Sequence, residues 1–121
     1  MDFLTHHEQE TRPWGFFERF TLNEPSTVKI IHVKPHQELS LQTHHKRAEF
    51  WYILTGIGEV TIHGLARPAK AQDEFEIPAG ASHRIAAGPD ELSFLEIALG
   101  NFSESDETRL EDDYGRNSPA A

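Results

Sequence analysis

Short strand-like runs separated by turn residues restrict the fold of this chain more than any other feature of its sequence. The runs favour β-structure through β-branched, aromatic and alternating residues, and no long helical period occurs before residue 103. Glycine and proline mark the turns between the runs. The expected strands cover residues 15–20, 27–33, 39–44, 49–54, 59–63, 66–71, 75–77, 83–86 and 92–99. Regular turn signals among short strands predict an all-β sandwich or barrel.

One domain of ordinary size accounts for the 121 residues, of which 37% are hydrophobic. We expect its core to span about residues 12–116 and the ends, 1–11 and 117–121, to be loose. Within residues 103–116 we expect a short tail or one helical turn, with Ser103 or Ser105 as the N-cap.

Charge and composition exclude several classes of function. The net charge of −9 argues against a nucleic-acid partner, because phosphate backbones require a basic surface. The absence of cysteine rules out disulfides, thiolate metal ligands and cysteine nucleophiles. The sequence has no run of 18 apolar residues and no apolar segment near its start, so we expect neither a membrane span nor a signal peptide. A cytoplasmic location is the default expectation.

Four polar residues have a spacing that predicts a metal site. Gln42 and His44 are two positions apart in an alternating run and therefore point to the same face of a strand. Glu49 begins the next strand after a short connection, and His83 follows a proline–glycine turn. If the strands pair closely, these side chains converge inside a barrel.

The chemistry of this set suits one divalent ion. Imidazole nitrogen, carboxylate and amide oxygen are ligands for Zn, Mn, Fe, Co or Ni, and the set does not distinguish among these metals. Of these metals, we expect zinc to be the one bound. A site at a barrel mouth leaves coordination positions for water or substrate, as catalytic metal sites do.

Two motifs in this sequence resemble those of the cupin superfamily. The first is Gln42-x-His44-x4-Glu49-x6-Gly56, and the second is Pro78-x-Gly80-x2-His83. The resemblance implies a single small antiparallel jelly-roll barrel with a metal at its centre. The motif's first glycine is replaced by His36.

A narrower resemblance, to the type II mannose-6-phosphate isomerase cupin that is also fused behind mannose-1-phosphate guanylyltransferases, covers about residues 12–116. It rests on the segments Arg12-Pro13-Trp14-Gly15, Leu39-Ser40-Leu41-Gln42, Arg47-Ala48-Glu49-Phe50-Trp51, Ile77-Pro78, His83-Arg84 and Asp112-Asp113-Tyr114-Gly115-Arg116. Where the family often has a third consecutive histidine and a histidine before Trp51, this chain has Lys46 and Phe50. No glycine-rich phosphate loop is present, so we do not expect guanylyl transfer from these residues.

The resemblance implies an isomerase that interconverts mannose 6-phosphate and fructose 6-phosphate with the help of the metal. The expected catalytic groups are Glu49, Lys46 and Arg84, with His45 and Glu96 as further candidates for the base. The expected substrate contacts are Arg47 and Arg116 for the phosphate and Trp14 for the sugar ring.

Two other functions stay open from the sequence alone. A metal-containing cupin that binds a sugar or regulates a partner without turnover has the same motifs. An iron-dependent oxygenase is the second alternative, although Gln42 in place of a histidine weakens it. In each case the expected ligand is a small molecule, and apolar surface on short strands predicts a homodimer.

Overall fold

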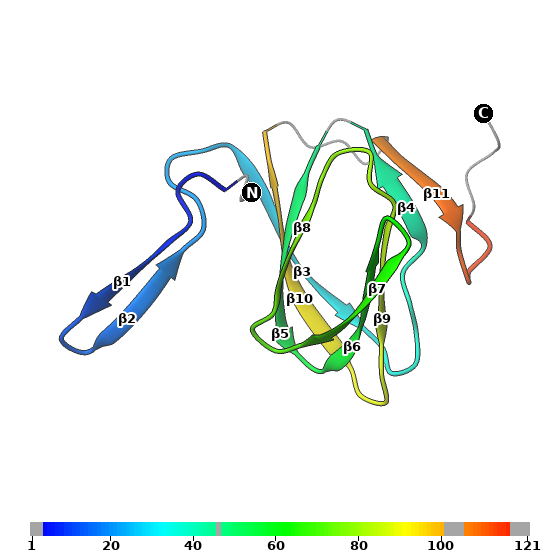
Figure 1. Cartoon of the computed structure of the whole chain (residues 1–121), viewed down its shortest axis with the longest axis horizontal. Helices are drawn as coiled ribbons and strands as arrows, with labels where there is room; N and C mark the ends of the chain where they lie inside the picture. The colour runs from blue at the N-terminus through cyan, green and yellow to red at the C-terminus, as the bar shows by residue number, and fades with distance from the viewer. Residues whose placement is uncertain (1–3, 46, 101–105, 117–121) are drawn as a thin grey trace.

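The structure is a computed structural model that describes residues 4–45, 47–100 and 106–116. Its described part is built from strands, which Figure 1 shows in chain order. They are β1 (Glu8–Arg12), β2 (Gly15–Arg19), β3 (Ser26–Val33), β4 (Leu41–His44), β5 (Glu49–Thr55), β6 (Ile57–Ile62), β7 (Leu65–Lys70), β8 (Glu74–Ile77), β9 (His83–Ala87), β10 (Leu92–Leu99) and β11 (Glu107–Glu111).

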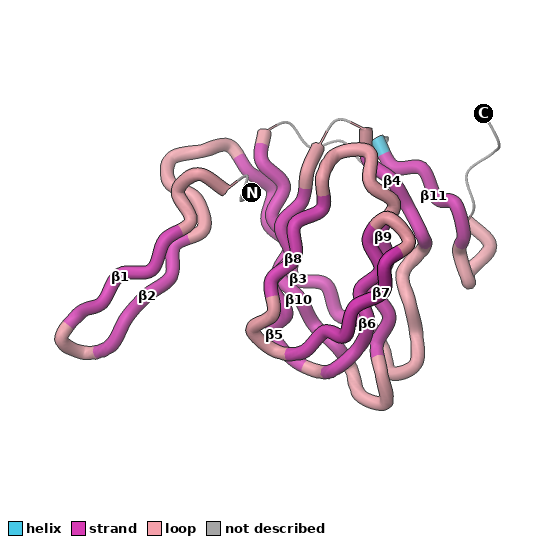
Figure 2. Tube along the Cα trace, in the orientation of Figure 1, coloured by secondary structure: helices cyan, strands magenta, loops and turns pink. Residues whose placement is uncertain are grey.

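Two antiparallel sheets face each other and form the barrel (Figures 1 and 2). The four-stranded sheet has the order β3-β10-β5-β8, and the five-stranded sheet has the order β11-β4-β9-β6-β7. A separate hairpin of β1 and β2 extends away from the barrel. The all-β antiparallel barrel expected from the sequence is confirmed.

Side-chain alternation divides β5 between two apolar layers. Trp51 and Ile53 point into the barrel, whereas Phe50 and Tyr52 lie on the outer face of the four-stranded sheet. The barrel interior is one buried cluster, to which β3, β6, β8, β9 and β10 also contribute apolar residues. Burial of this apolar surface is the main stabilising contribution to the barrel.

Turn geometry requires glycine at the junction of β5 and β6. Gly56 has φ +88°, and a Cβ atom there would lie 2.4 Å from the carbonyl oxygen of Glu91. His36 stands where the first cupin motif has glycine, and its φ of 61° is also in the left-handed region. Position 36 therefore has a backbone conformation that glycine adopts without strain.

Both chain ends depart from the sequence-based expectation. The helical turn or tail expected in residues 103–116 is wrong for Glu107–Glu111, which pair with β4 as strand β11. Ser103 and Ser105, the expected caps, lie outside the described residues. Part of the lead-in that was expected to be loose forms β1, since Glu8–Arg12 pair with β2 in a regular antiparallel register. Residues 117–121 also lie outside the described part.

No helix in the described part of the chain is long and apolar enough to cross a membrane.

Candidate metal centre

Three of the four predicted ligands meet between the two sheets. His44 ends β4 and His83 begins β9 in the five-stranded sheet, whereas Glu49 begins β5 in the four-stranded sheet. His44 Nδ1 lies 3.7 Å from Glu49 Oε2, and His83 Nε2 lies 3.6 Å from Glu49 Oε1. One ligand atom from each residue lies within 4.8 Å of the other two, so the group could hold a metal ion.

The side chains in this group are buried and lack ordinary partners. His44, Glu49 and His83 are each at most 4% exposed. Both ring nitrogens of His44, Nε2 of His83 and Oε1 of Glu49 have no hydrogen-bond partner among the described residues. Buried polar atoms normally find such partners, because an unpaired one costs about 1–3 kcal/mol. Convergent unpaired nitrogens and a carboxylate oxygen therefore fit a bound cation.

Protonation states favour coordination as well. Burial lowers the pKa of His44 to about 4 and lowers the pKa of His83, so both rings are neutral near pH 7. His83 Nδ1 donates a hydrogen bond to the carbonyl oxygen of Ala81 at 3.0 Å. This bond assigns the proton to Nδ1 and leaves the Nε2 lone pair directed to the site.

Gln42 lies beside the group on β4. It is the cross-strand neighbour of His83, and it lines the same pocket as Ser40 and His44. The face shared by Ser40, Gln42 and His44, which alternation in the sequence predicted, therefore points into the barrel.

Arg47 orients the carboxylate of the group. Its Nε donates a hydrogen bond to Glu49 Oε2 at 2.9 Å, and both side chains are buried. With Oε2 held by Arg47, the second oxygen of Glu49, Oε1, lies 3.6 Å from His83 Nε2. Arg47 was expected to bind substrate phosphate, and the structure places it in the pocket wall against Glu49.

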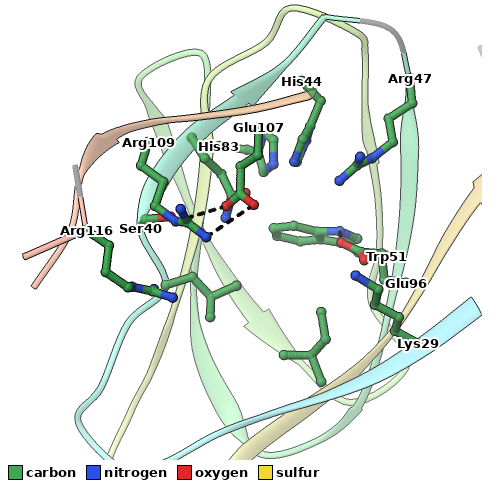
Figure 3. Close-up of a pocket in the computed structure, with 13 residues that line it drawn as sticks. Lys29, Ser40, His44, Arg47, Trp51, His83, Glu96, Glu107, Arg109 and Arg116 are labelled. Atoms are coloured by element: carbon green, nitrogen blue, oxygen red, sulfur yellow. Dashed lines mark hydrogen bonds and ion pairs between the residues drawn. The ribbon is translucent and has the colours of Figure 1, made fainter. Parts of the chain in front are cut away.

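A pocket of about 190 Å³ opens beside the candidate ligands (Figure 3). Its cationic side chains come from three parts of the barrel, and Figure 3 shows Lys29 and Arg116 on opposite sides of it. The lining consists of Lys29, Ile31, Leu39, Ser40, Gln42, His44, Arg47, Trp51, His83, Glu96, Glu107, Arg109 and Arg116. Four of the chain's eleven lysines and arginines are in this lining, together with two carboxyl groups, those of Glu96 and Glu107.

Glu96 lies in the pocket wall between Lys29 and Trp51, its cross-strand neighbours on β3 and β5. Trp51 Nε1 donates a hydrogen bond to Glu96 Oε1 at 3.3 Å. Burial, followed by the nearby Glu49 carboxylate, raises the pKa of Glu96. Among the candidates for the base that the sequence suggested, Glu96 lines the pocket and has a raised pKa.

Strand β11 supplies pocket residues that the sequence interpretation missed. Arg109 is paired with Gln42 across β11 and β4, and Glu107 is paired with His44. Arg109 Nε lies 3.3 Å from Glu107 Oε1, within the pocket lining. The alternation of Glu107 and Arg109 was a usable signal, but the expectation of a helical turn placed them on a helix surface.

Arg116 reaches the pocket from the segment after β11. Its guanidinium is fixed by Asp112, with Nε 3.0 Å from Oδ2 and Nη2 3.1 Å from Oδ1. This bidentate pair holds an exposed arginine beside the pocket. Lys29 is a further pocket residue that the sequence interpretation missed. It could have been noticed as the one cationic residue within the apolar run of β3.

Arg84 and Trp14, which were also expected at the site, are not brought into the pocket. Arg84 points away from it: Nε donates to the carbonyl oxygen of Leu39 at 2.9 Å, and the guanidinium also lies near Glu38. Trp14 lies at the turn of the β1–β2 hairpin, 73% exposed and outside the pocket lining. Lys46 lies outside the described residues.

A small antiparallel barrel with two histidines and a glutamate at its mouth defines a cupin. Solved structures agree with this class. A Cupin 2 conserved barrel domain protein from Salinispora arenicola matches with a TM-score of 0.59 and 25% identity, covering 66% of this chain and 67% of its own. A double-stranded β-helix protein from Klebsiella pneumoniae has a TM-score of 0.64 at 22% identity, covering 74% of this chain and 78% of its own, and supports the fold alone.

Sequence comparison identifies the family within this class. The profile "Mannose-6-phosphate isomerase C-terminal" matches residues 2–112, and the chain belongs to that family. The mannose-1-phosphate guanylyltransferase ManC of Salmonella typhimurium is 38% identical over 112 residues, which are 91% of this chain and 23% of that protein. The alginate biosynthesis protein AlgA of Pseudomonas aeruginosa is 36% identical over 118 residues, 96% of this chain and 24% of that protein. The chain thus spans about a quarter of the length of these curated relatives.

Proposed function

We propose that this chain is a metal-dependent aldose–ketose isomerase that interconverts mannose 6-phosphate and fructose 6-phosphate. One observation carries the proposal: the buried group of His44, Glu49 and His83 adjoins a pocket whose lining is rich in lysine and arginine. Such a pocket suits a small anion with hydroxyl groups, and membership of the isomerase C-terminal family supports a sugar phosphate as that anion.

The metal would be held by His44, Glu49 and His83, with Gln42 as a fourth ligand. Zinc is our first choice because a mixed nitrogen and oxygen set of this size suits it, and Mn, Fe, Co and Ni are compatible with the same donors. When bound, the ion would act as a Lewis acid toward the sugar oxygens at C1 and C2.

The phosphate group is assigned to Arg109 and Arg116. Both line the pocket beside β11, and a planar guanidinium matches the geometry of phosphate oxygens. Arg47 is less suited to this role because it is buried and hydrogen-bonded to Glu49. In our proposal Arg47 therefore positions the metal ligand, and the arginines beside β11 bind the substrate.

Glu96 is our candidate for the group that moves the proton. The isomerisation removes a proton from C2 of the open-chain aldose and returns one to C1, while a hydroxyl proton moves between O2 and O1. Burial raises the pKa of Glu96 to about 8, so near that pH its ionised form can accept the carbon-bound proton and its neutral form can return it. Glu49 is less available for this step because Arg47 and the two histidines surround it.

The test is turnover by metal-depleted protein that has been reloaded with Zn, Mn, Co or Ni. We expect fructose 6-phosphate to form from mannose 6-phosphate, and we expect unphosphorylated mannose to react much more slowly. Glu96→Gln should reduce kcat by about 10²–10⁴-fold, the usual contribution of a positioned acid–base group, while the variant retains its metal. Binding of the sugar phosphate without turnover under all four metals would contradict the proposal and favour a binding protein.

A matched pair of arginine variants tests the phosphate site. Arg109→Met should raise KM for mannose 6-phosphate by about 10–100-fold, as expected for loss of a charge-assisted hydrogen bond. Arg67→Met, on the exposed strand β7, is the control and should leave KM unchanged. Equal effects of the two substitutions would remove Arg109 from the site.

A further inference from the structure

Strand β3 carries a lysine on the face that points into the barrel. Exposed and partly buried residues alternate along β3, and Val28 and Ile30 are 54% and 55% exposed on its outer face. Lys29 lies on the opposite face, where it is partly buried and lines the pocket together with Ile31. A lysine is seldom placed on the inner face of a barrel strand, because removing its charge from water costs free energy unless a partner compensates. The position of Lys29 therefore indicates a role in the pocket.

Lys29, Glu96 and Trp51 form one row across three adjacent strands. Glu96 on β10 is the cross-strand neighbour of both Lys29 on β3 and Trp51 on β5. Figure 3 shows the three side chains together on one side of the pocket. Burial raises the pKa of Glu96 and the positive charge of Lys29 lowers it, so the two groups lie within electrostatic reach of each other. The row therefore places a cation beside the carboxyl group that we assign to proton transfer.

The two arginines assigned to the phosphate come from the other side of the pocket. Arg109 is on β11, the edge strand of the five-stranded sheet, whereas β3 is an edge strand of the four-stranded sheet. Arg116 follows β11, and Figure 3 shows it across the pocket from Lys29. In mannose 6-phosphate the phosphate group is on C6, at the far end of the open chain from C1 and C2. A substrate held by its phosphate beside β11 therefore extends its reacting carbons toward β3 and β10.

The reacting oxygens carry more negative charge during the isomerisation than before it. When the Glu96 carboxylate takes the C2 proton, the C2–H electron pair forms the C1=C2 bond and the carbonyl electron pair moves to O1. The charge passes to O2 as the hydroxyl proton moves from O2 to O1. Return of the proton from Glu96 to C1 then forms the carbonyl group of the ketose at C2. A fixed cation near O1 and O2 stabilises this charge more than it stabilises the neutral carbonyl, and so lowers the barrier.

We propose that Lys29 is a catalytic residue whose ammonium group contacts the C1 and C2 oxygens of the substrate and stabilises the enediolate. This inference rests on the proposed isomerase function, and it gives Lys29 a different role from that of the arginines. Arg109 and Arg116 bind charge that is present throughout the reaction, whereas Lys29 acts on charge that develops during it. A compact ammonium group on a flexible stem suits this task, because it can follow the charge from O1 to O2.

The first experiment compares the kinetics of wild type, Lys29→Met and Lys70→Met after reloading with the same metal. Lys29→Met should reduce kcat by about 10²–10³-fold, the usual effect of removing one group that stabilises an oxyanion, and should change KM by less than about threefold. Lys29→Gln, which keeps a polar group beside Glu96, should give the same result and guards against a folding defect of the first variant. Lys70 pairs with Asp73 on the surface, so Lys70→Met is the matched control and should leave both constants unchanged. Each variant should bind as much metal as wild type by elemental analysis.

Calorimetry separates the proposed role from ordinary substrate binding. One ligand is 5-phosphoarabinonohydroxamate, whose planar pair of oxygens copies the enediolate. The other is mannitol 6-phosphate, which carries the same phosphate but has no carbonyl group. Lys29→Met should weaken binding of the hydroxamate at least about 10-fold and leave binding of mannitol 6-phosphate within about twofold, which also shows that the variant is folded. Equal weakening of both ligands, or of neither, would overturn the proposal.

A double substitution tests whether Lys29 acts only through Glu96. In the Glu96→Gln background, Lys29→Met should still weaken hydroxamate binding at least about 10-fold, because the ammonium group contacts the ligand directly. Loss of that effect would make Lys29 a positioning residue for Glu96 and would overturn the proposal. The proposed function has its own readout. An inactive wild type would remove it and this inference together, whereas full activity of Lys29→Met beside an active wild type would remove the inference alone.

Discussion

Replacing Arg47 by methionine should reveal how the barrel stabilises the buried Glu49 carboxylate. Arg47 Nε donates to Glu49 Oε2 at 2.9 Å, and both side chains are buried. Removal of one partner from a buried ion pair costs about 3–5 kcal/mol, because the remaining charge has no counterion in a dry environment. We therefore expect Arg47→Met, without metal, to lose about 3–5 kcal/mol of the free energy of unfolding.

Zinc should recover part of this loss. An ion held by His44, Glu49 and His83 restores positive charge beside the carboxylate, so we expect a recovery of at least about 1.4 kcal/mol, a tenfold coupling. The assay is urea unfolding followed by tryptophan fluorescence at one protein concentration, first with a chelator and then with excess zinc.

The control for this experiment is Lys70→Met, because Lys70 pairs with Asp73 at 3.6 Å on the surface. That pair should contribute less than about 1 kcal/mol. An Arg47→Met loss as small as that of the control, or a loss that zinc does not change, would show that Arg47 does not stabilise the buried Glu49 carboxylate.

Three further predictions concern pH, Arg84 and His36. The pKa of His44 is about 4 in the folded chain and about 6.5 in the unfolded chain, so between these values the unfolded state binds more protons. The free energy of unfolding must therefore decrease as the pH falls from about 6.5 to about 4. Metal-free wild type should lose about 2 kcal/mol more than His44→Gln between pH 7 and pH 5 in urea unfolding. Arg84→Met should lower the free energy of unfolding by about 1–2 kcal/mol through the lost bond to Leu39, with KM unchanged in steady-state kinetics; a changed KM with full stability would return Arg84 to the site. His36→Gly should raise the free energy of unfolding by about 0.5 kcal/mol through relief of left-handed strain, whereas His32→Gly in extended β3 should lower it in the same urea assay; the same sign for both would exclude the strain argument.

The pocket combines features that a purely structural metal site does not need. A structural ion is usually enclosed by its ligands, whereas this group adjoins a cavity of about 190 Å³. The cavity also brings Glu96 and Lys29 together on neighbouring strands beside the candidate ligands. In the proposed isomerase, variants of Glu96 should therefore reduce turnover without reducing the amount of bound metal.

Local periodicity explains why much of the barrel could be predicted from the sequence. Alternation in β3, β5 and β10 is a property of neighbouring residues and does not depend on distant parts of the chain. The shared face of Gln42 and His44 follows from the same rule. The positions of Glu49 and His83 followed from a short connection and a proline–glycine turn, which are also local signals.

The chain ends could not be predicted in this way. Residues 107–111 are polar except for Leu110 and follow two serines, which locally favours a capped helical turn. They form β11 instead, because β4 offers an open edge. Glu8–Arg12 likewise became a strand only through pairing with β2. Strand pairing satisfies backbone groups through residues that are distant in sequence, so local patterns do not report it.

The arginines separate the features that local sequence patterns predict from those that depend on the folded chain. Strand alternation and motif spacing are local signals, and they were enough to predict an acidic β-barrel whose histidine and glutamate residues could hold a metal. Only the fold decided that Arg109 and Arg116 line the pocket, that Arg84 binds carbonyl oxygens elsewhere, and that Trp14 lies on an exposed arm. A long cationic or aromatic side chain can find hydrogen-bond or packing partners in several places. Strand order and edge pairing, which join residues distant in sequence, select one of them.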